Sequence, residues 1–286
     1  MAVLDQLTLL APGLLGGSVA RAARAAGLAR RIVLWARRPE TRAALCAQPW
    51  CDAAPDTLEE ATAGASLVVI ASPVDQIATL AARIRPALPA GALVTDVGSV
   101  KAEVCRAVAA ALGDRAVFIG AHPMAGSEKT GWEHSRADLF QGRACFVTPL
   151  PATPAAAVEK VASFWRALGC RVTAVPPAEH DRIVAHISHL PQLAASALCA
   201  ALAGRDSGWR AFAGGGLRDT TRIAGSDPEL WRTILAQNRP EVLAALDTYL
   251  SELQGLRAAL AGGDLAAVTA VLERGQAYRA GIPPAP

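Results

Sequence analysis

The strongest indication of the fold of this chain is the stretch Leu7-Thr8-Leu9-Leu10-Ala11-Pro12-Gly13-Leu14-Leu15-Gly16-Gly17-Ser18. It begins as a continuous apolar run, typical of a strand buried on both faces, and passes through a glycine-rich turn into a helical pattern. The turn matches the G-x-G-x-x-G dinucleotide-binding fingerprint, with Ala11 at the first glycine position. Gly13 would let the backbone approach a pyrophosphate, and Gly16 would let the helix pack tightly on the strand. We therefore predict that Gly13, Leu14, Leu15 and Gly16 hold a dinucleotide at the helix N-terminus; the alternative is a turn that binds nothing.

Strands and helices alternate through the first part of the chain. Apolar, β-branched runs at residues 32–35, 67–71, 92–95 and 117–119 predict strands, and the patterns at 18–26, 74–84 and 100–112 predict helices. This order with short connections predicts an α/β fold, a Rossmann-type doubly wound parallel sheet. Runs at 145–148 and 171–175, separated by a helix at 155–168, are expected to extend the same sheet.

The pattern changes after Pro176-Pro177, because no β-branched run recurs. Residues 179–203, 228–260 and 265–275 have apolar positions at three- and four-residue spacing, which predicts helices. We therefore divide the chain into a dinucleotide-binding domain over residues 1–177 and an all-α domain over 178–286. The helical domain is expected to bind substrate and to form a homodimer.

Composition excludes several classes of protein. With 52% hydrophobic and 19% charged residues the chain of 286 residues is not intrinsically disordered. A net charge of +3 gives no electrostatic case for binding nucleic acid. The six cysteines form no C-x-x-C pair, so we expect buried free thiols and a reducing compartment. The N-terminus lacks the basic segment of a signal peptide, and the longest apolar run, residues 190–204, is short for a membrane span. We expect a cytoplasmic protein with no membrane partner.

The end of the second predicted strand, Trp35-Ala36-Arg37-Arg38, is where this kind of fold distinguishes NAD from NADP. An acidic residue there would bind the ribose hydroxyls of NAD, and none is present. A planar guanidinium can bind a 2′-phosphate bidentately, so Arg37 and Arg38 predict NADP rather than NAD. The alternative is that both arginines are ordinary surface charges. Ser72 and Pro73, which follow the third strand, complete the predicted cofactor site.

Four further segments carry a family resemblance. They are Asp96-Val97-Gly98-Ser99-Val100-Lys101, His122-Pro123-Met124-Ala125-Gly126, Ser188-His189-Leu190-Pro191 and Thr221-Arg222-Ile223-Ala224. In this order, behind a dinucleotide loop, they resemble the prephenate/arogenate dehydrogenases of tyrosine biosynthesis. The resemblance covers roughly residues 7 to 255. It implies oxidative decarboxylation of prephenate or arogenate: hydride leaves ring C4 for the nicotinamide and the ring carboxylate leaves as carbon dioxide. The product is 4-hydroxyphenylpyruvate or tyrosine.

The resemblance assigns catalytic roles to two residues. His122 accepts the proton of the ring hydroxyl, a task that suits an imidazole that is neutral near pH 7. Ser99 hydrogen-bonds this histidine and lies close to the nicotinamide; a turn or helix N-cap serine is the alternative. We leave His180 and His134 as surface or interdomain residues.

The same resemblance places substrate-binding residues in both domains. Arg222 binds the ring carboxylate, and His189 faces the side-chain end of the substrate. Ser127, Glu128 and Lys129 form a loop that closes over the substrate. His186 raises the alternative of a metal site with His189, but no third ligand is in register, so we predict no metal. Prephenate and arogenate are not distinguished by these residues.

Two other readings remain open. One is a two-domain dehydrogenase of the β-hydroxyacid type, which would use a lysine on the first interdomain helix; here that helix offers histidines instead. The other is an NADP-sensing protein without catalysis, which would have lost His122, Ser99 or Arg222. Two of the three lysines, Lys101 of the Asp96–Lys101 segment and Lys129 of the Ser127–Lys129 loop, are expected to lie at the proposed cleft, so arginine there is expected to impair turnover or binding. The same exchange at the third, Lys160, is expected to have no effect.

Overall fold

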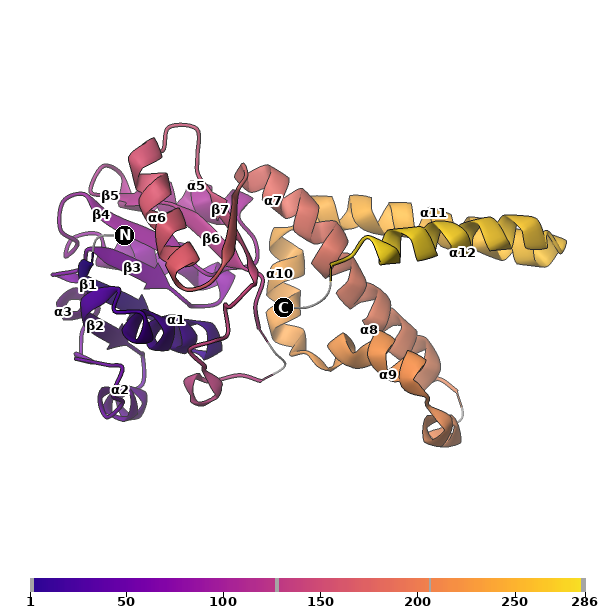
Figure 1. Ribbon diagram of the computed structural model, residues 1–286, viewed down its shortest axis with the longest axis horizontal. Helices are drawn as coiled ribbons and strands as arrows, with labels where there is room; N and C mark the ends of the chain where they lie inside the picture. Colours follow the sequence, from indigo (N-terminus) through magenta and orange to yellow (C-terminus); the bar gives the residue numbers. More distant parts are fainter. Residues whose placement is uncertain (1–2, 127–128, 206, 284–286) are drawn as a thin grey trace.

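The structure, a computed structural model, describes residues 3–126, 129–205 and 207–283. A sheet-containing half formed by the earlier residues and a helical half formed by the later ones lie side by side (Figure 1). The main sheet has the strand order β2-β1-β3-β4-β5, with every neighbouring pair parallel. This confirms the predicted doubly wound sheet. Its strands are β1 (Leu4–Leu10), β2 (Ala29–Trp35), β3 (Leu67–Ile70), β4 (Ala92–Asp96) and β5 (Ala116–Phe118).

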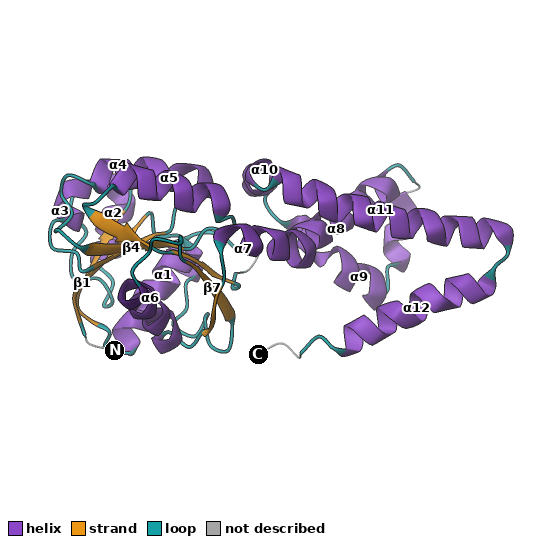
Figure 2. Cartoon of the chain, turned by 90° about the horizontal axis from the view of Figure 1, so that it is seen from above, coloured by secondary structure: helices purple, strands orange, loops and turns teal. Residues whose placement is uncertain are grey.

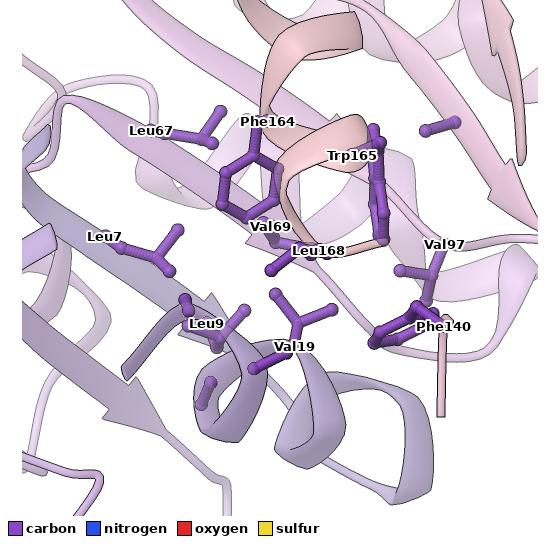
Figure 3. Packing of buried hydrophobic residues seen from close by; sticks show 14 of the residues in the cluster. Leu7, Leu9, Val19, Leu67, Val69, Val97, Phe140, Phe164, Trp165 and Leu168 are labelled. Atoms are coloured by element: carbon purple, nitrogen blue, oxygen red, sulfur yellow. The ribbon is translucent and has the colours of Figure 1, made fainter. Parts of the chain in front are cut away.

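Helices cover both faces of this sheet (Figure 2). They are α1 (Leu14–Ala25), α2 (Pro39–Cys46), α3 (Leu58–Thr62), α4 (Ile77–Ile84), α5 (Ala102–Leu112) and α6 (Ala155–Ala167). Successive strand residues enter opposite faces, so Leu9 packs with α1 and α6 while Leu10 packs with α4 and α5. Figure 3 shows the first of these cores, in which Leu7, Leu9, Phe164 and Trp165 are buried together. The continuous apolar runs of the sequence follow from this burial on both faces.

A second sheet contradicts the expectation that the later strands extend the first. β6 (Gly120–Pro123) pairs antiparallel with β7 (Ala144–Thr148), which pairs parallel with β8 (Arg171–Ala174). The backbone N–H of Ile119 still donates to Val94 on β4, and the chain then leaves the main sheet for β7. An apolar run predicts a strand but does not specify the partner of that strand, which is why the expectation was wrong.

The helical half begins with one continuous helix. It comprises α7 (Pro177–Val184), a π-helical turn (Ala185–His189) and α8 (Leu190–Ala203). Pro191 cannot donate a hydrogen bond to the carbonyl of Ile187, and the wider turn lies just before it. The remaining helices are α9 (Gly215–Thr221), α10 (Pro228–Gln237), α11 (Arg239–Gly262) and α12 (Leu265–Ala280). The single helix expected over 228–260 is therefore two helices, separated at Asn238.

The stretch Pro177–Ala203 is long and apolar enough to cross a membrane, by length and composition only. An 18-residue stretch of this helix has a mean hydropathy of 1.3, and 28% of that stretch is buried within the protein. The sequence analysis considered only the apolar run at residues 190–204, which is too short to span a membrane. The continuous helix of the structure is longer than that run. A core helix of a soluble protein passes the same test, and His180, Asp181 and His189 of this helix are buried against the rest of the protein.

The six cysteines are free thiols. Four are buried, as expected: Cys51, Cys105, Cys145 and Cys170. Cys46 is exposed at the end of α2 and Cys199 is half-buried on α8, which differs from the expectation of burial throughout.

Candidate active site

The glycine-rich turn lies at the carboxyl end of β1, where the strand order of the sheet reverses between β1 and β3. Ligands of open α/β sheets bind at such a point. A Cβ atom built on Gly16 would lie 2.8 Å from the Cβ of Ala71, so the predicted tight helix–strand packing at Gly16 is present. A Cβ on Gly13 would meet nothing within 4 Å, which leaves this end of α1 open to a ligand. Ala11 adopts φ 54°, a left-handed conformation that glycine adopts more readily.

A cleft of about 920 Å³ lies beside this turn. Ala11, Arg37, Arg38, Ser72 and Pro73 contribute to its lining from the ends of β1, β2 and β3. The other wall comes from the helical half, through Asp227 and α10. The cleft therefore collects several of the predicted cofactor residues, whereas Gly13, Leu14 and Leu15 are half-buried in the adjoining turn.

Arg37 and Arg38 are exposed in this cleft. Within the described parts of the chain neither guanidinium is in an ion pair. Asp75, which also lines the cleft, accepts a hydrogen bond from the side-chain amide of Gln76. After the end of β2 the cleft therefore contains two guanidinium groups that are in no ion pair among the described residues, and residues 35–38 include no carboxylate.

His122 lies on the short strand β6, which follows β5 directly along the chain. Its Nδ1 is 2.9 Å from Nε2 of His180, and Nδ1 of His180 is 2.8 Å from an oxygen of Asp181. His180 is fully buried on α7, and its ring packs edge-on against His122 and Phe146. Our assignment of His180 to the surface or interdomain region missed this direct contact with the predicted proton acceptor.

The two histidines have lowered pKa values. Burial is the main cause of the drop in the pKa of His122, which falls well below its ordinary value of 6.5, and the like charge of His180 adds to it. Burial also lowers the pKa of His180, and the hydrogen bond to Asp181 partly opposes this. Both rings are therefore neutral near pH 7, and a neutral imidazole can accept a proton.

His189 lies in the π-helical turn, close enough to His122 for their charges to interact. Its Nδ1 is 3.2 Å from the amide nitrogen of Asn238, which also donates to the carbonyl of Asp181 at 2.9 Å. Because an amide N–H donates, Nδ1 of His189 accepts and its proton is on Nε2. Burial lowers the pKa of His189 to about 4, so this ring is neutral. Among the described residues, its buried Nε2–H has no hydrogen-bond partner.

The Asp96–Lys101 segment builds a buried support beneath His122. Lys101 is fully buried, and its Nζ pairs with Asp96 and donates to the carbonyl of Ala121 at 2.9 Å. Asp96 also accepts from the backbone N–H groups of Gly98 and Ala121. Lys101 is thus a structural residue in the interior, not a residue of the cleft as its motif had suggested.

Ser99 is half-buried in the loop between β4 and α5. Across the described residues no hydrogen bond joins it to His122, whose Nδ1 is paired with His180. It is not the N-cap of α5 either. Asp181 performs that task from α7, accepting from the N–H groups of Lys101 and Ala102 at 2.8 Å each. The role of Ser99 stays a prediction.

The predicted substrate residues are distributed unevenly. Arg222 is exposed in the turn after α9, which packs against α8, and within the described chain it is in no ion pair. Lys129 is exposed. Ser127 and Glu128 lie outside the described residues. His186 is exposed and donates from Nδ1 to the carbonyl of Arg182, and the described residues contain no group of three or more metal-ligating side chains.

Three site residues escaped the sequence analysis: His180, Asp181 and Asn238. The adjacent His-Asp pair at the start of the interdomain helix was a usable signal for the first two. Asn238 was hidden inside what looked like one long helix, although Pro240 marks a break.

A doubly wound domain with a glycine-rich turn, joined to a helical domain that walls the same cleft, defines a dinucleotide-binding oxidoreductase of two domains. Family models identify the particular group. The model described as prephenate dehydrogenase, nucleotide-binding domain, matches residues 19–174, and the one described as prephenate dehydrogenase, dimerization domain, matches residues 176–274. The chain belongs to the prephenate dehydrogenase family.

Individual relatives agree with this assignment. The chain is 32% identical over 268 residues to a cyclohexadienyl dehydrogenase of Zymomonas mobilis, covering 92% of this chain and 91% of the relative. A prephenate dehydrogenase of Aquifex aeolicus, solved with hydroxyphenyl propionate and NAD+, superimposes with a TM-score of 0.90 at 28% identity, covering 97% and 98% of the two chains. The arogenate dehydrogenase of Synechocystis has a TM-score of 0.84 at 27% identity, covering 96% and 98%.

Proposed function

We propose that this protein oxidises prephenate, arogenate or both, with NADP as the preferred cofactor. The observation that carries the proposal is the neutral, buried His122 at the seam of the two domains of a prephenate dehydrogenase fold. A nicotinamide held in the cleft would supply the acceptor for the hydride that leaves ring C4 of the substrate, and loss of the ring carboxylate as carbon dioxide would make the ring aromatic.

In this proposal His122 takes up the proton of the ring hydroxyl as the hydride leaves C4, and it returns this proton to the ring oxygen once decarboxylation has made the ring a phenol. The atom available for this task is Nε2, because Nδ1 is occupied by His180. A low pKa keeps the ring unprotonated down to a pH below the ordinary histidine range. Ser99 is proposed to contact the reacting end of the site, as the family resemblance implies.

The chain's own groups fit a dinucleotide. The N-terminal end of α1, Gly13 to Gly16, is uncapped by any side chain and has no acidic residue in its first turn, so its N–H groups and dipole favour a pyrophosphate. Arg37 and Arg38 would hold the 2′-phosphate of NADP, and Ser72 and Pro73 line the same cleft. NAD lacks that phosphate, so it would leave both guanidiniums without an anionic partner.

Substrate recognition is proposed to use both domains. The Nε2–H of His189 is a buried donor with no partner among the described residues, so it suits an acceptor at the side-chain end of the substrate. Arg222 is a guanidinium free of ion pairs in the described chain, and it would pair with the ring carboxylate. Ser127, Glu128 and Lys129 are assigned to the substrate loop by family resemblance alone.

We further propose a cytoplasmic homodimer that binds neither nucleic acid nor membrane. Among the described residues the large hydrophobic side chains left exposed lie, apart from Val3, in the helical half. A matching dimerization-domain model covers the same half. A second copy packed on these helices would also cover the apolar surface of α8.

The test is turnover of prephenate and of arogenate, each supplied with NAD and with NADP, followed by the absorbance of the reduced nicotinamide. We expect kcat/KM to be higher with NADP for whichever substrate is turned over. Failure of every mixture would overturn the activity, and equal or better turnover with NAD would overturn the cofactor preference.

Two variants separate the cofactor preference from general damage. Arg37→Ser should raise the Kd of NADP and leave that of NAD unchanged, because only NADP carries the 2′-phosphate. The control is Arg31→Ser, an exposed position near the start of β2, which should change the Kd of neither cofactor. Fluorescence titration of reduced cofactor measures both constants.

A further inference from the structure

His122, His180 and Asp181 form one hydrogen-bonded chain that crosses from β6 to α7. All three side chains are buried. At its far end Asp181 accepts from three donors: the ring of His180 and the backbone N–H groups of Lys101 and Ala102. Both N–H groups belong to the start of α5, so the helix that supports Asp181 lies in the nucleotide-binding half.

These hydrogen bonds allow only one placement of the ring protons on His122 and His180. Asp181 receives hydrogen bonds only, so Nδ1 of His180 must carry a proton. Because His180 is neutral, its Nε2 is then an acceptor, and Nδ1 of His122 must donate to it. His122 is neutral as well, so its own Nε2 carries no proton. Without a fixed partner at Nδ1, either nitrogen of the His122 ring could hold the proton.

We propose that His180 and Asp181 are positioning residues that hold His122 in the tautomer with a bare Nε2. This deepens the proposed function and rests on it, because the bare Nε2 is the atom that takes the proton of the ring hydroxyl. When it does, the imidazolium formed keeps its Nδ1–H bond to His180, and the carboxylate of Asp181 stabilises the new charge.

Asp181, acting through His180, is the group near His122 that fixes the positions of the ring protons. The other groups around His122 do not do so. Lys101 and Asp96 of the β4–α5 segment are paired with one another. His189 of the π-helical turn accepts from Asn238 and does not bond to His122. On β7, Cys145 is a buried thiol whose pKa burial raises well above its ordinary value, so it stays protonated. Phe146 contributes only its ring edge to His180.

The direct test reads the tautomer in the unaltered protein, by nitrogen-15 NMR of histidine-labelled enzyme with no substrate bound. Nδ1 of His122 should be protonated and Nε2 bare near pH 7. The assignment of the His122 signals comes from their loss in His122→Asn. A protonated Nε2 would overturn the proposal while leaving the proposed function untouched, since that function is tested separately by turnover.

A variant supplies the functional readout. His180→Phe keeps a buried ring but removes the acceptor, so Nδ1 of His122 loses its partner. We expect kcat to fall roughly 10²-fold, with the Kd of cofactor unchanged and the tautomer of His122 no longer fixed. The acidic limb of the kcat profile should also move to lower pH, because the imidazolium of His122 would no longer be stabilised through His180 by the carboxylate of Asp181.

Two further variants distinguish positioning from simple structural support. His180→Gln retains an amide that can accept from Nδ1 of His122, and it should recover part of the lost kcat. His186→Gln changes an exposed histidine of the same continuous helix and should leave kcat and the pH profile as they are. An unchanged kcat and pH profile in folded His180→Phe would overturn the proposal; should that variant not fold, the tautomer of the unaltered protein still decides.

Discussion

The two halves of the molecule differ in how much of their apolar surface they bury within the chain. The sheet half has two extensive cores, one on each face of the main sheet, and in the described residues Val3 is its one large hydrophobic side chain left exposed. The helical half has a small core of Ala185, Val242 and Ala245, with partly buried neighbours, and α12 contains no buried residue. Tyr278 of α12 is 72% exposed.

The two halves therefore obtain their stability in different ways. The sheet half buries its apolar surface within one chain, whereas the helical half leaves apolar side chains exposed that the proposed second copy would cover. The candidate site residues do not follow this division. His122 of the sheet half and His189 of the helical half are buried, while Arg37 and Arg222, one from each half, are exposed.

Removing the buried lysine should produce the largest effect on the sheet half. Lys101→Ala leaves Asp96 as an unpaired buried charge, which costs about 3–5 kcal/mol of unfolding free energy. Denaturant unfolding should show this loss at every protein concentration. Lys160→Ala on the exposed side of α6 is the control and should change little. A loss that appeared only on dilution would contradict the self-sufficiency of this half.

Acid should weaken the seam between the halves. His189 is buried with a pKa of about 4, below its ordinary 6.5, so the unfolded chain takes up a proton before the folded one does. Stability should therefore fall as pH falls from about 6.5 towards 4, by roughly 3 kcal/mol for this group. Unfolding followed across this range measures the slope, and His189→Gln should flatten it. An equal slope in the variant would remove His189 as its source.

Placing a charge on α11 should break the helical half selectively. Leu253 is 43% exposed there, and Leu253→Glu would bury a carboxylate in the proposed dimer interface. We expect the dimer dissociation constant to rise by roughly 10²-fold, measured by sedimentation over a dilution series. Lys160→Glu in the sheet half should leave it unaltered. Equal dissociation constants for Leu253→Glu and the parent would place the interface elsewhere.

The smallest effect concerns the glycine-rich turn. Ala11 has φ 54°, a left-handed conformation that costs a residue with a Cβ roughly 1–2 kcal/mol. Ala11→Gly removes this cost but frees the unfolded chain, so a net gain of about 0.5–1 kcal/mol is expected. Ala167→Gly, at the end of α6, should instead lose stability. If both variants lost stability alike, Ala11 would not be strained.

The sequence predicted the main sheet well because its strands are buried on both faces and each ends in a turn. It did not predict β6, because residues 120–123 form a short strand whose partners are distant along the chain. The break between α10 and α11 was missed because apolar spacing continues across Asn238. Pairing between strands and packing between helices are tertiary choices that local patterns do not encode.

The site was predictable where chemistry follows a motif. The glycine-rich turn, the arginines after β2 and His122 were predicted as site residues from motifs, and the structure brings Ala11 of the turn and the two arginines to one cleft. Their roles stay predictions. His180 was not recognised because its role depends on α7 lying against β6 and β7, a contact between two domains. Lys101 was recognised but assigned to the cleft, whereas its complete burial makes it a support.

The decisive measurement for His122 as the proton acceptor is the rate of hydride transfer in His122→Asn. In a single turnover with prephenate or arogenate, whichever the parent enzyme uses, formation of reduced nicotinamide should slow by roughly 10²–10⁴-fold relative to that enzyme. The Kd of the cofactor should be unchanged, because His122 lies on β6 and does not line the cofactor cleft. If this variant transferred hydride as fast as the parent enzyme, His122 would not be the proton acceptor.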